Sequence, residues 1–198
     1  MKLKLALSLS ALFFAGSLLA SPQIGQAAPA FSLKDSKGQS HTLADFTGKT
    51  VVLEWSNHEC PFVVKHYSGN MQSLQKQFGT DDVVWLTVIS SAPGKQGHIT
   101  AAKADELTSS RNAMPDAVLF DETGVTGKAY DAKTTPHMYV IDKKGVLQYM
   151  GGIDSIASAK VDDIAKATPY FSDALSAVLA GNPANPAVTK PYGCSIKY

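Results

Sequence analysis

Cys60 is the residue of this chain that is best placed to do chemistry. It follows a short apolar run at residues 51–55 that is typical of a buried strand, and Pro61 after it suits the first turn of a helix. A helix N-terminus presents unpaired N–H groups and the positive end of the helix dipole, and both stabilise a thiolate. Thiols at such positions have pKa values between about 3.5 and 7.5, against about 8.5 for free cysteine. We therefore expect a reactive nucleophile, and a buried inert cysteine is the alternative.

The elements that must position Cys60 alternate between strands and helices. Apolar runs of strand length occur at residues 51–55, 83–89, 118–120, 136–141 and 146–150. Helical spacing of apolar residues occurs at 61–79 and 160–180, with a break expected at Pro169, and residues 98–112 are predicted to be helical on a weak pattern. Residues 29–48 form a lead-in segment with a turn at 35–38, and the last two strands form a hairpin. This order predicts an α/β fold in which the early strands are parallel and the late pair is antiparallel.

The composition excludes several classes of protein. The 198 residues carry 18 Lys and Arg against 17 Asp and Glu, and Arg111 is the only arginine. Such a balance argues against a surface that binds nucleic acid or an anionic membrane. Two cysteines are too few for a disulfide scaffold or for a zinc site with four thiolates. The length favours a single domain.

Residues 1–20 are typical of a secretory signal peptide. Lys2 and Lys4 precede an apolar run of about 15 residues, and small residues gather at Ala20 and Ser21. The run is shorter than the roughly 20 apolar residues that a membrane-spanning helix needs. We expect cleavage after Ala20 and a mature protein without stable membrane association, in the periplasm or secreted, where disulfides persist. An uncleaved N-terminal anchor is the alternative.

Several motifs resemble the thioredoxin-like fold in their order and spacing. They are APAFSL at residues 28–33, GKTVVLEW at 48–55, CP at 60–61 and TPHMYVID at 135–142. More narrowly they resemble the redoxin branch, which is related to alkyl hydroperoxide reductases, thiol-specific antioxidants (AhpC/TSA) and periplasmic thiol-disulfide oxidoreductases. The resemblance covers residues 22–180 and implies a central mixed β-sheet flanked by helices, followed by a C-terminal tail at 181–198. It also implies an oxidoreductase without a cofactor that acts on protein or small-molecule thiols and disulfides, or on hydroperoxides.

The resemblance assigns roles to individual residues. Cys60 matches the nucleophilic cysteine, and Pro136 matches the cis-proline that faces the thiol. Thr135 matches the residue whose backbone can pair with a bound substrate chain, so Thr135, Pro136 and Pro61 are candidate substrate-binding residues. Glu54 matches the buried acidic residue that transfers protons in thioredoxins, and a carboxyl in a strand core has a raised pKa. An exposed carboxylate at the strand end is the alternative for Glu54.

The chain also departs from the patterns of this family. Thioredoxins have a second cysteine three residues after the first, and here that position is Val63, so no local dithiol can form. Peroxiredoxins have threonine and proline three and seven residues before the cysteine, where this chain has Asn57 and Leu53. They also need an arginine beside the thiolate, and only Arg111 is available. A peroxiredoxin-like thiol peroxidase is therefore the alternative function, although the chain lacks the sequence motif that is typical of peroxiredoxins.

Cys194 is the only other thiol that could resolve an oxidised Cys60 within the chain. The preceding residues 181–191 contain three prolines, which predicts an extended, flexible tail that can reach Cys60 and retreat. A resolving cysteine would attack a mixed disulfide or a sulfenic acid on Cys60. The alternatives are a permanent staple, worth about 4–5 kcal/mol for so long a loop, and a bond to another molecule. We favour a redox-active pair, with Cys60 as nucleophile and Cys194 as resolving cysteine.

His58 and His66 flank Cys60 in sequence and raise the possibility of a metal. Imidazole and thiolate together suit copper or zinc, and related thioredoxin-like copper carriers use two cysteines and a distal histidine. This chain lacks that set, so we expect no metal site. We interpret both histidines as residues that tune the thiol and line a docking surface. A copper-binding or interaction domain with a structural disulfide is the remaining, non-enzymatic alternative.

Overall fold

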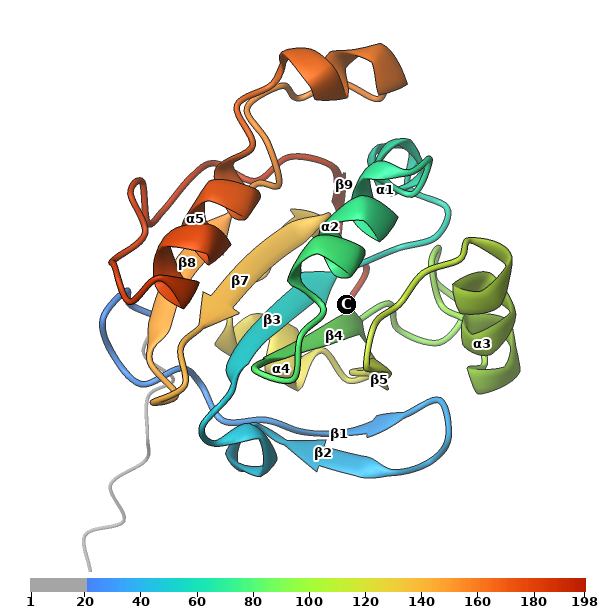
Figure 1. Ribbon diagram of the computed structural model, residues 1–198. Coiled ribbons are helices and arrows are strands. Elements are labelled where there is room, and N and C mark those ends of the chain that lie inside the picture. Colours follow the sequence, from blue (N-terminus) through green and yellow to red (C-terminus); the bar gives the residue numbers. More distant parts are fainter. Residues whose placement is uncertain (1–20) are drawn as a thin grey trace, which may run out of the picture.

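The computed structural model describes residues 21–198, so the predicted leader at 1–20 lies outside the described residues. A seven-stranded mixed sheet forms its centre, in the order β2-β1-β5-β4-β3-β7-β8 (Figure 1). The strands are β1 (Ser32–Asp35), β2 (Ser40–Thr42), β3 (Thr50–Trp55), β4 (Val83–Ile89), β5 (Ala117–Phe120), β7 (His137–Ile141) and β8 (Leu147–Gly151). Strands β3, β4 and β5 are parallel, and β7 pairs antiparallel with both β3 and β8. The expected mixed sheet, with early parallel strands and a late hairpin, is confirmed.

Helices cover the sheet on both sides. They are α1 (Pro61–His66), α2 (Asn70–Phe78), α3 (Ala101–Ser110), α4 (Val125–Ala129) and α5 (Tyr170–Leu179), with 3-10 turns η1 (Leu43–Phe46) and η2 (Val161–Lys166). Figure 1 shows α1, α2 and α5 on one face, α4 behind the sheet and α3 to one side, while η2 projects from the body. Among residues 21–198, none of these helices is long and apolar enough to cross a membrane.

The core lies on both faces of the central strands. Every residue of β3 and β4 is buried, which is typical of strands covered on two sides. Side chains alternate along β3, so Val52 packs with Met71 and Phe171 in one cluster while Trp55 packs with Tyr139 in the other. The same alternation places Glu54 on the face of Val52. A carboxyl group therefore lies inside the apolar layer beneath α1 and α2.

The helix expected at 61–79 is two helices, and the prediction of one continuous helix is wrong. Gly69 separates α1 from α2 with a φ of 134°, a conformation that side chains rarely adopt. The apolar spacing continues across the break because Tyr67 and Met71 still face the core. The break at Pro169 is confirmed, since η2 ends before it and α5 starts after it. The lead-in segment forms the antiparallel pair β1–β2 around the expected turn.

The C-terminal tail is extended and non-helical, as predicted, but it is not loose. Its strand β9 (Cys194–Ser195) pairs with β6 (Thr134–Thr135) in a small second sheet. Further along, the Ile196 amide donates to Lys133 O at 3.1 Å, and the Tyr198 hydroxyl donates to Ala132 O at 2.8 Å. An extended backbone offers free N–H and C=O groups, and here the domain binds them. In Figure 1 the tail runs from α5 to β9 beside α1, and the C-terminus lies within the outline of the domain.

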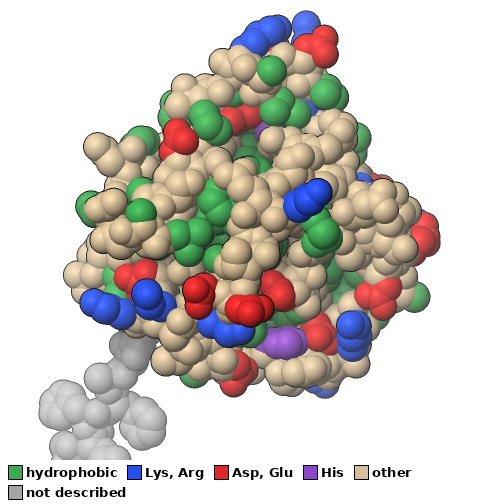
Figure 2. Space-filling model, viewed as in Figure 1, with side chains coloured by type: hydrophobic (Ala, Val, Ile, Leu, Met, Phe, Trp, Pro, Cys, Tyr) green, Lys and Arg blue, Asp and Glu red, His purple; other side chains and the backbone are tan. Residues whose placement is uncertain are grey.

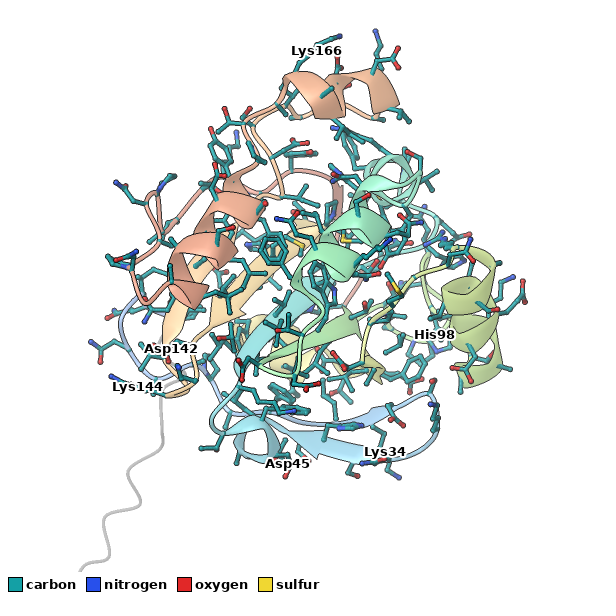
Figure 3. The ribbon with its side chains drawn as sticks, viewed as in Figure 1. Lys34, Asp45, His98, Asp142, Lys144 and Lys166 are labelled. Atoms are coloured by element: carbon teal, nitrogen blue, oxygen red, sulfur yellow. The ribbon has the colours of Figure 1, made fainter. Side chains whose placement is uncertain are left out.

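Charged side chains of both signs are mixed on the surface. Figure 2 shows Lys, Arg, Asp and Glu interspersed along the lower edge of the molecule rather than in a patch of one sign. In Figure 3, Lys34, Asp45, Asp142 and Lys144 lie toward that edge, away from α1, and Lys166 lies on the projecting η2. The face in view therefore offers no concentrated field for a polyanion, in line with the net charge.

Candidate active site

Cys60 caps the N-terminus of α1, at the junction of strand and helix that the sequence predicts. Its backbone is extended, with φ −75° and ψ 123°, and Pro61 is the first helical residue. The Cys60 side chain is 0% exposed, and its thiol donates a hydrogen bond to Thr135 O at 3.0 Å. The nucleophile candidate is thus held against the β6 strand by a backbone contact.

Thr135 and Pro136 lie beside the Cys60 sulfur. The peptide bond between them is cis, as the resemblance implies, and both residues are buried. Pro61 is exposed at the start of α1. The structure therefore brings Thr135 and Pro136 to the thiol, and it places Pro61 at the surface next to the nucleophile.

Cys194 reaches the same place from the tail. It pairs with Thr135 across the β6–β9 ladder, and its amide donates to the Cys60 Sγ at 3.4 Å. The Thr135 hydroxyl donates to Cys194 O at 3.4 Å. Both cysteines are free thiols in this structure. Residues that lie far apart in the sequence therefore form one site that contains two sulfur atoms.

The two thiols are electrostatically unequal. Burial raises the pKa of Cys60, but hydrogen bonds from the Cys194 thiol, the amides of Val63 and Cys194 and the Thr135 side chain outweigh it, so the pKa is lowered from its ordinary value. For Cys194, burial and the hydrogen bond and charge of the neighbouring Cys60 raise the pKa to about 11. Cys60 therefore ionises first, and Cys194 stays protonated as a donor to it.

Glu54 is wholly buried below α1, and the alternative of an exposed carboxylate is wrong. Its carboxylate accepts from the Tyr67 hydroxyl at 2.8 Å and from Trp85 Nε1 at 2.9 Å, with Thr87 Oγ1 at 3.4 Å. Burial raises the pKa of Glu54 in spite of these donors, as expected for this position. Within residues 21–198, no hydrogen bond joins Glu54 to either cysteine, so any proton exchange between them needs an intermediate group.

A small cavity of about 40 Å³ lies beside the hydroxyl groups that donate hydrogen bonds to Glu54. Its polar lining comes from Ser56, His58, Tyr67, Thr87, Thr108 and Arg111. The Arg111 guanidinium stacks 4.9 Å from the Tyr67 ring centroid and donates to His58 O at 3.1 Å. The space can hold a water molecule in contact with hydroxyl groups. Arg111, remote in sequence, thus lies against the loop before Cys60, although no hydrogen bond to the sulfur occurs in the described chain.

His66 does not line a docking surface, and that interpretation is wrong for this residue. It is 0% exposed, and its Nε2 lies 3.0 Å from the Tyr192 hydroxyl of the tail. Burial lowers the pKa of His66 to about 4, so the ring is neutral at pH 7. The Tyr192 hydroxyl also donates to Asp154, whose second oxygen lies 3.4 Å from Lys65 Nζ. A buried polar cluster therefore fixes the tail to α1.

Sequence reasoning missed the residues that support the site. Tyr67 and Trp85 fit apolar patterns, so only their hydroxyl and indole N–H groups hinted at a buried polar partner such as Glu54. Tyr192, two positions before Cys194, gave no signal at all. Within residues 21–198 there is no group of three His, Cys, Asp or Glu side chains that could hold a metal ion.

Comparisons with known proteins agree with this geometry. The AhpC/TSA family model matches residues 24–150. Thioredoxin-like protein YneN of Bacillus subtilis (strain 168) is 32% identical over 128 residues, which cover 64% of this chain and 69% of that protein. Chloroplastic peroxiredoxin Q of Populus jackii is 30% identical over 126 residues, which cover 63% of this chain and 57% of that protein.

Solved structures share the fold. A hypothetical protein, SMc02350 from Sinorhizobium meliloti 1021, superposes with a TM-score of 0.74 at 22% identity, over 90% of this chain and 96% of that one. A putative thiol:disulfide interchange protein DsbE from Chlorobium tepidum superposes with a TM-score of 0.52 at 24% identity, over 66% and 85%. The predicted thioredoxin-like fold is thereby confirmed. With the match of the family model over most of the domain, the chain belongs to the AhpC/TSA family of thioredoxin-like redoxins.

Proposed function

We propose that this protein is a thiol-disulfide oxidoreductase in which Cys60 is the nucleophile and Cys194 the resolving cysteine. The observation that carries the proposal is the position of Cys194, which is paired with Thr135 and donates its amide to the Cys60 sulfur at 3.4 Å. The order of the pKa values supports the assignment of roles, because Cys60 ionises before Cys194.

Exchange with a disulfide substrate takes two steps. The Cys60 thiolate attacks one sulfur of the substrate, so a Cys60–substrate disulfide forms, the substrate disulfide breaks and one substrate thiolate leaves. Cys194 then loses its proton and attacks the Cys60 sulfur, which forms the Cys60–Cys194 disulfide and releases the second substrate thiolate. The substrate gains two electrons, and the cysteine pair loses two.

A permanent staple accounts less well for Cys194. The β6–β9 ladder, the Tyr192 hydroxyl and the Tyr198 hydroxyl hold the tail through contacts that do not involve a sulfur–sulfur bond. The position of the tail therefore does not require a covalent link. A redox-active pair should have a reduction potential above about −300 mV, whereas a structural disulfide typically lies below that value.

Glu54 is proposed as the group that exchanges protons with the site. Tyr67 and Thr87, which donate hydrogen bonds to Glu54, also line the small cavity. A water molecule in this cavity would connect the buried carboxyl to the hydroxyl groups of Ser56 and Thr108. General acid–base groups contribute about 10²–10⁴ in rate, so Glu54→Gln should slow exchange by a factor in that range.

The test is the reduction of insulin disulfides by the full chain and its cysteine variants, with dithiothreitol as the reductant that returns the Cys60–Cys194 disulfide to two thiols. Cys60→Ser should abolish turnover. Reduced Cys194→Ser, mixed with insulin after dithiothreitol is removed, should stop after the first step and accumulate a mixed disulfide that mass spectrometry detects. Full activity in Cys60→Ser would refute the mechanism. A Cys194→Ser variant that turns over as fast as the native chain would remove Cys194 from it.

A thiol peroxidase with an antioxidant role is the second candidate. Arg111 favours it, because this guanidinium lies against His58, two residues before Cys60. In that reaction the Cys60 thiolate attacks a hydroperoxide oxygen, becomes a sulfenic acid and releases an alcohol or water. Asn57 and Leu53 stand where peroxiredoxins have threonine and proline. Stopped-flow measurement of Cys60 oxidation by peroxide distinguishes the two functions. Oxidation of Cys60 no faster than that of free cysteine contradicts the peroxidase.

The periplasm, or the space outside the cell, is the proposed location. This proposal rests on the leader-like residues 1–20. The partners would be protein or small-molecule thiols and disulfides. Mass spectrometry of the purified mature protein tests it, because cleavage after Ala20 gives a chain that begins at Ser21.

A further inference from the structure

The Cys60 sulfur is inaccessible to other molecules while β9 stays paired with β6. The side chain is 0% exposed, with Thr135 O at 3.0 Å and the Cys194 amide at 3.4 Å from its sulfur. Disulfide exchange needs the incoming sulfur in contact with the attacking one. Any reaction of Cys60 with an external disulfide therefore requires that β9 leave first.

The tail lies on the domain as an added strand. Thr134 pairs with Ser195 and Thr135 with Cys194, and β9 is the only strand that β6 pairs with in the described chain. When β9 leaves, the backbone groups of β6 become a free edge directly beside the nucleophile. Free strand edges bind extended segments through backbone hydrogen bonds.

We infer that the C-terminal tail is an internal ligand that occupies the substrate-binding edge implied for Thr135, so that the tail must be displaced before a partner segment can react, and that this edge selects partner segments with glycine directly before the cysteine. The inference rests on the proposed exchange function and adds the displacement of the tail and the sequence that the partner segment needs. In that register the partner's cysteine lies opposite Thr135, where Cys194 lies in the closed state.

Gly193 lies so close to β6 that no side chain fits at its position. Its φ is 138°, and a Cβ at this position would overlap the Thr135 carbonyl group and come within 3.3 Å of Pro136 N. A segment that binds in the register of the tail should therefore have glycine directly before its cysteine. Ser195, after the cysteine, is exposed, so that position tolerates other side chains.

The anchors of the tail are non-covalent and lie on both sides of Cys194. Tyr192 contacts His66 and Asp154 on one side, and Tyr198 packs against Gly124 and donates to Ala132 O on the other. Such contacts can release and re-form. The tail can thus admit a partner segment and then return Cys194 to the mixed disulfide on Cys60.

The experiment uses the full chain with Cys194→Ser, so that the tail cannot resolve the product. The probe is the nine-residue peptide of residues 190–198 with its cysteine as a mixed disulfide with thionitrobenzoate. Attack by Cys60 forms a Cys60–peptide disulfide, breaks the peptide–thionitrobenzoate bond and releases the coloured thiolate. Gly193→Ala is added to displace the tail, and Gly181→Ala is the matched control, since its φ is also positive, at 79°, with no atom within 4 Å of the added Cβ.

We expect Gly193→Ala to speed thiolate release about tenfold, the equivalent of one lost backbone hydrogen bond, and Gly181→Ala to leave it unchanged. A probe with alanine before its cysteine should react about tenfold more slowly than the glycine probe. Hydrogen exchange at the Ile196 amide, which donates to Lys133 O, should show that Gly193→Ala frees the tail. Tyr198→Ala gives a second way to free it if Gly193→Ala does not fold.

Equal release rates with a docked and a freed tail would overturn the inference and leave the exchange function intact. An Ile196 amide that stays protected in Gly193→Ala would contradict the close approach to Thr135 and overturn it as well. Release in none of the variants would refute the exchange chemistry of Cys60, and the inference with it.

Discussion

Replacement of Glu54 by glutamine should stabilise the protein at neutral pH and not at acid pH. The carboxyl is wholly buried, and burial raises its pKa above the ordinary value of 4.5. Glutamine has the same shape and can keep the contacts: its oxygen accepts from Trp85 Nε1, and its amide donates to the Tyr67 hydroxyl, which rotates. The substitution therefore removes the ionisation of the group, and the Tyr67 O–H turns to the neighbouring Thr87 hydroxyl.

The size and sign of the effect follow from proton linkage. Between pH 4.5 and the raised pKa, the folded chain holds a proton that the unfolded chain has released, so stability falls as pH rises. The slope for one proton is about 1.4 kcal/mol per pH unit. Below pH 4.5 the carboxyl is protonated in both states, and the two proteins should differ by less than about 1 kcal/mol. Above the raised pKa, the advantage of glutamine becomes constant.

Urea unfolding of both proteins between pH 4 and pH 9 measures the difference. Glu106→Gln is the matched control, because this side chain is exposed and its pair with Lys103 should contribute little. The control should show no rising advantage over the same range. A Glu54→Gln advantage that does not change with pH, or a variant less stable than the native chain at pH 8, would refute the assignment of a buried carboxyl with a raised pKa.

Three further outcomes are expected. Tyr192→Phe loses its hydroxyl contacts with Asp154 and His66, so urea unfolding should show a loss of about 1–3 kcal/mol, and a loss below 0.5 kcal/mol would contradict a buried polar cluster. Gly69→Ala forces a side chain into a φ of 134° and should cost about 1–3 kcal/mol in the same assay, and an unchanged midpoint would contradict that backbone. Thiolate absorbance of the reduced chain should rise in two steps, first for Cys60, whose pKa is lowered, and then for Cys194 near pH 11, and a single step for both thiols would refute their inequality.

The central sheet was predictable because its strands are buried on both faces. Continuous apolar runs of this length, such as residues 83–89, are typical of strands covered on two sides, and a turn between two runs predicts the β7–β8 hairpin. The break at Gly69 was not predictable from the spacing of apolar residues, because the spacing persists across it. α1 ends at His66, and Gly69 begins α2 with a φ of 134°, a conformation that the spacing of apolar residues does not report.

The candidate site was predictable only where it depends on residues that are close together in the sequence. Cys60 owes its position to local order, since a buried strand, a cysteine and a proline specify a helix N-terminus. Docking of the tail depends on contacts between residues far apart in the sequence, such as Tyr192 with His66. Prolines indicate an extended chain equally well whether it is free or bound, so the sequence predicted the shape of the tail and not its attachment.

In the proposed exchange reaction, the coupling between the two sulfurs sets the order of the two steps. In the reduced protein, burial and the nearby Cys60 keep Cys194 protonated, so it donates to Cys60 and does not compete as a nucleophile. Once Cys60 is part of a mixed disulfide, its sulfur carries no charge and accepts a hydrogen bond only weakly. Because β9 has also left its place, the burial of Cys194 is lost together with the hydrogen bond and the charge of Cys60, whereas Lys197, which lowers the pKa, lies on the same tail. In the proposed exchange, the first chemical step therefore activates the cysteine that is proposed to perform the second.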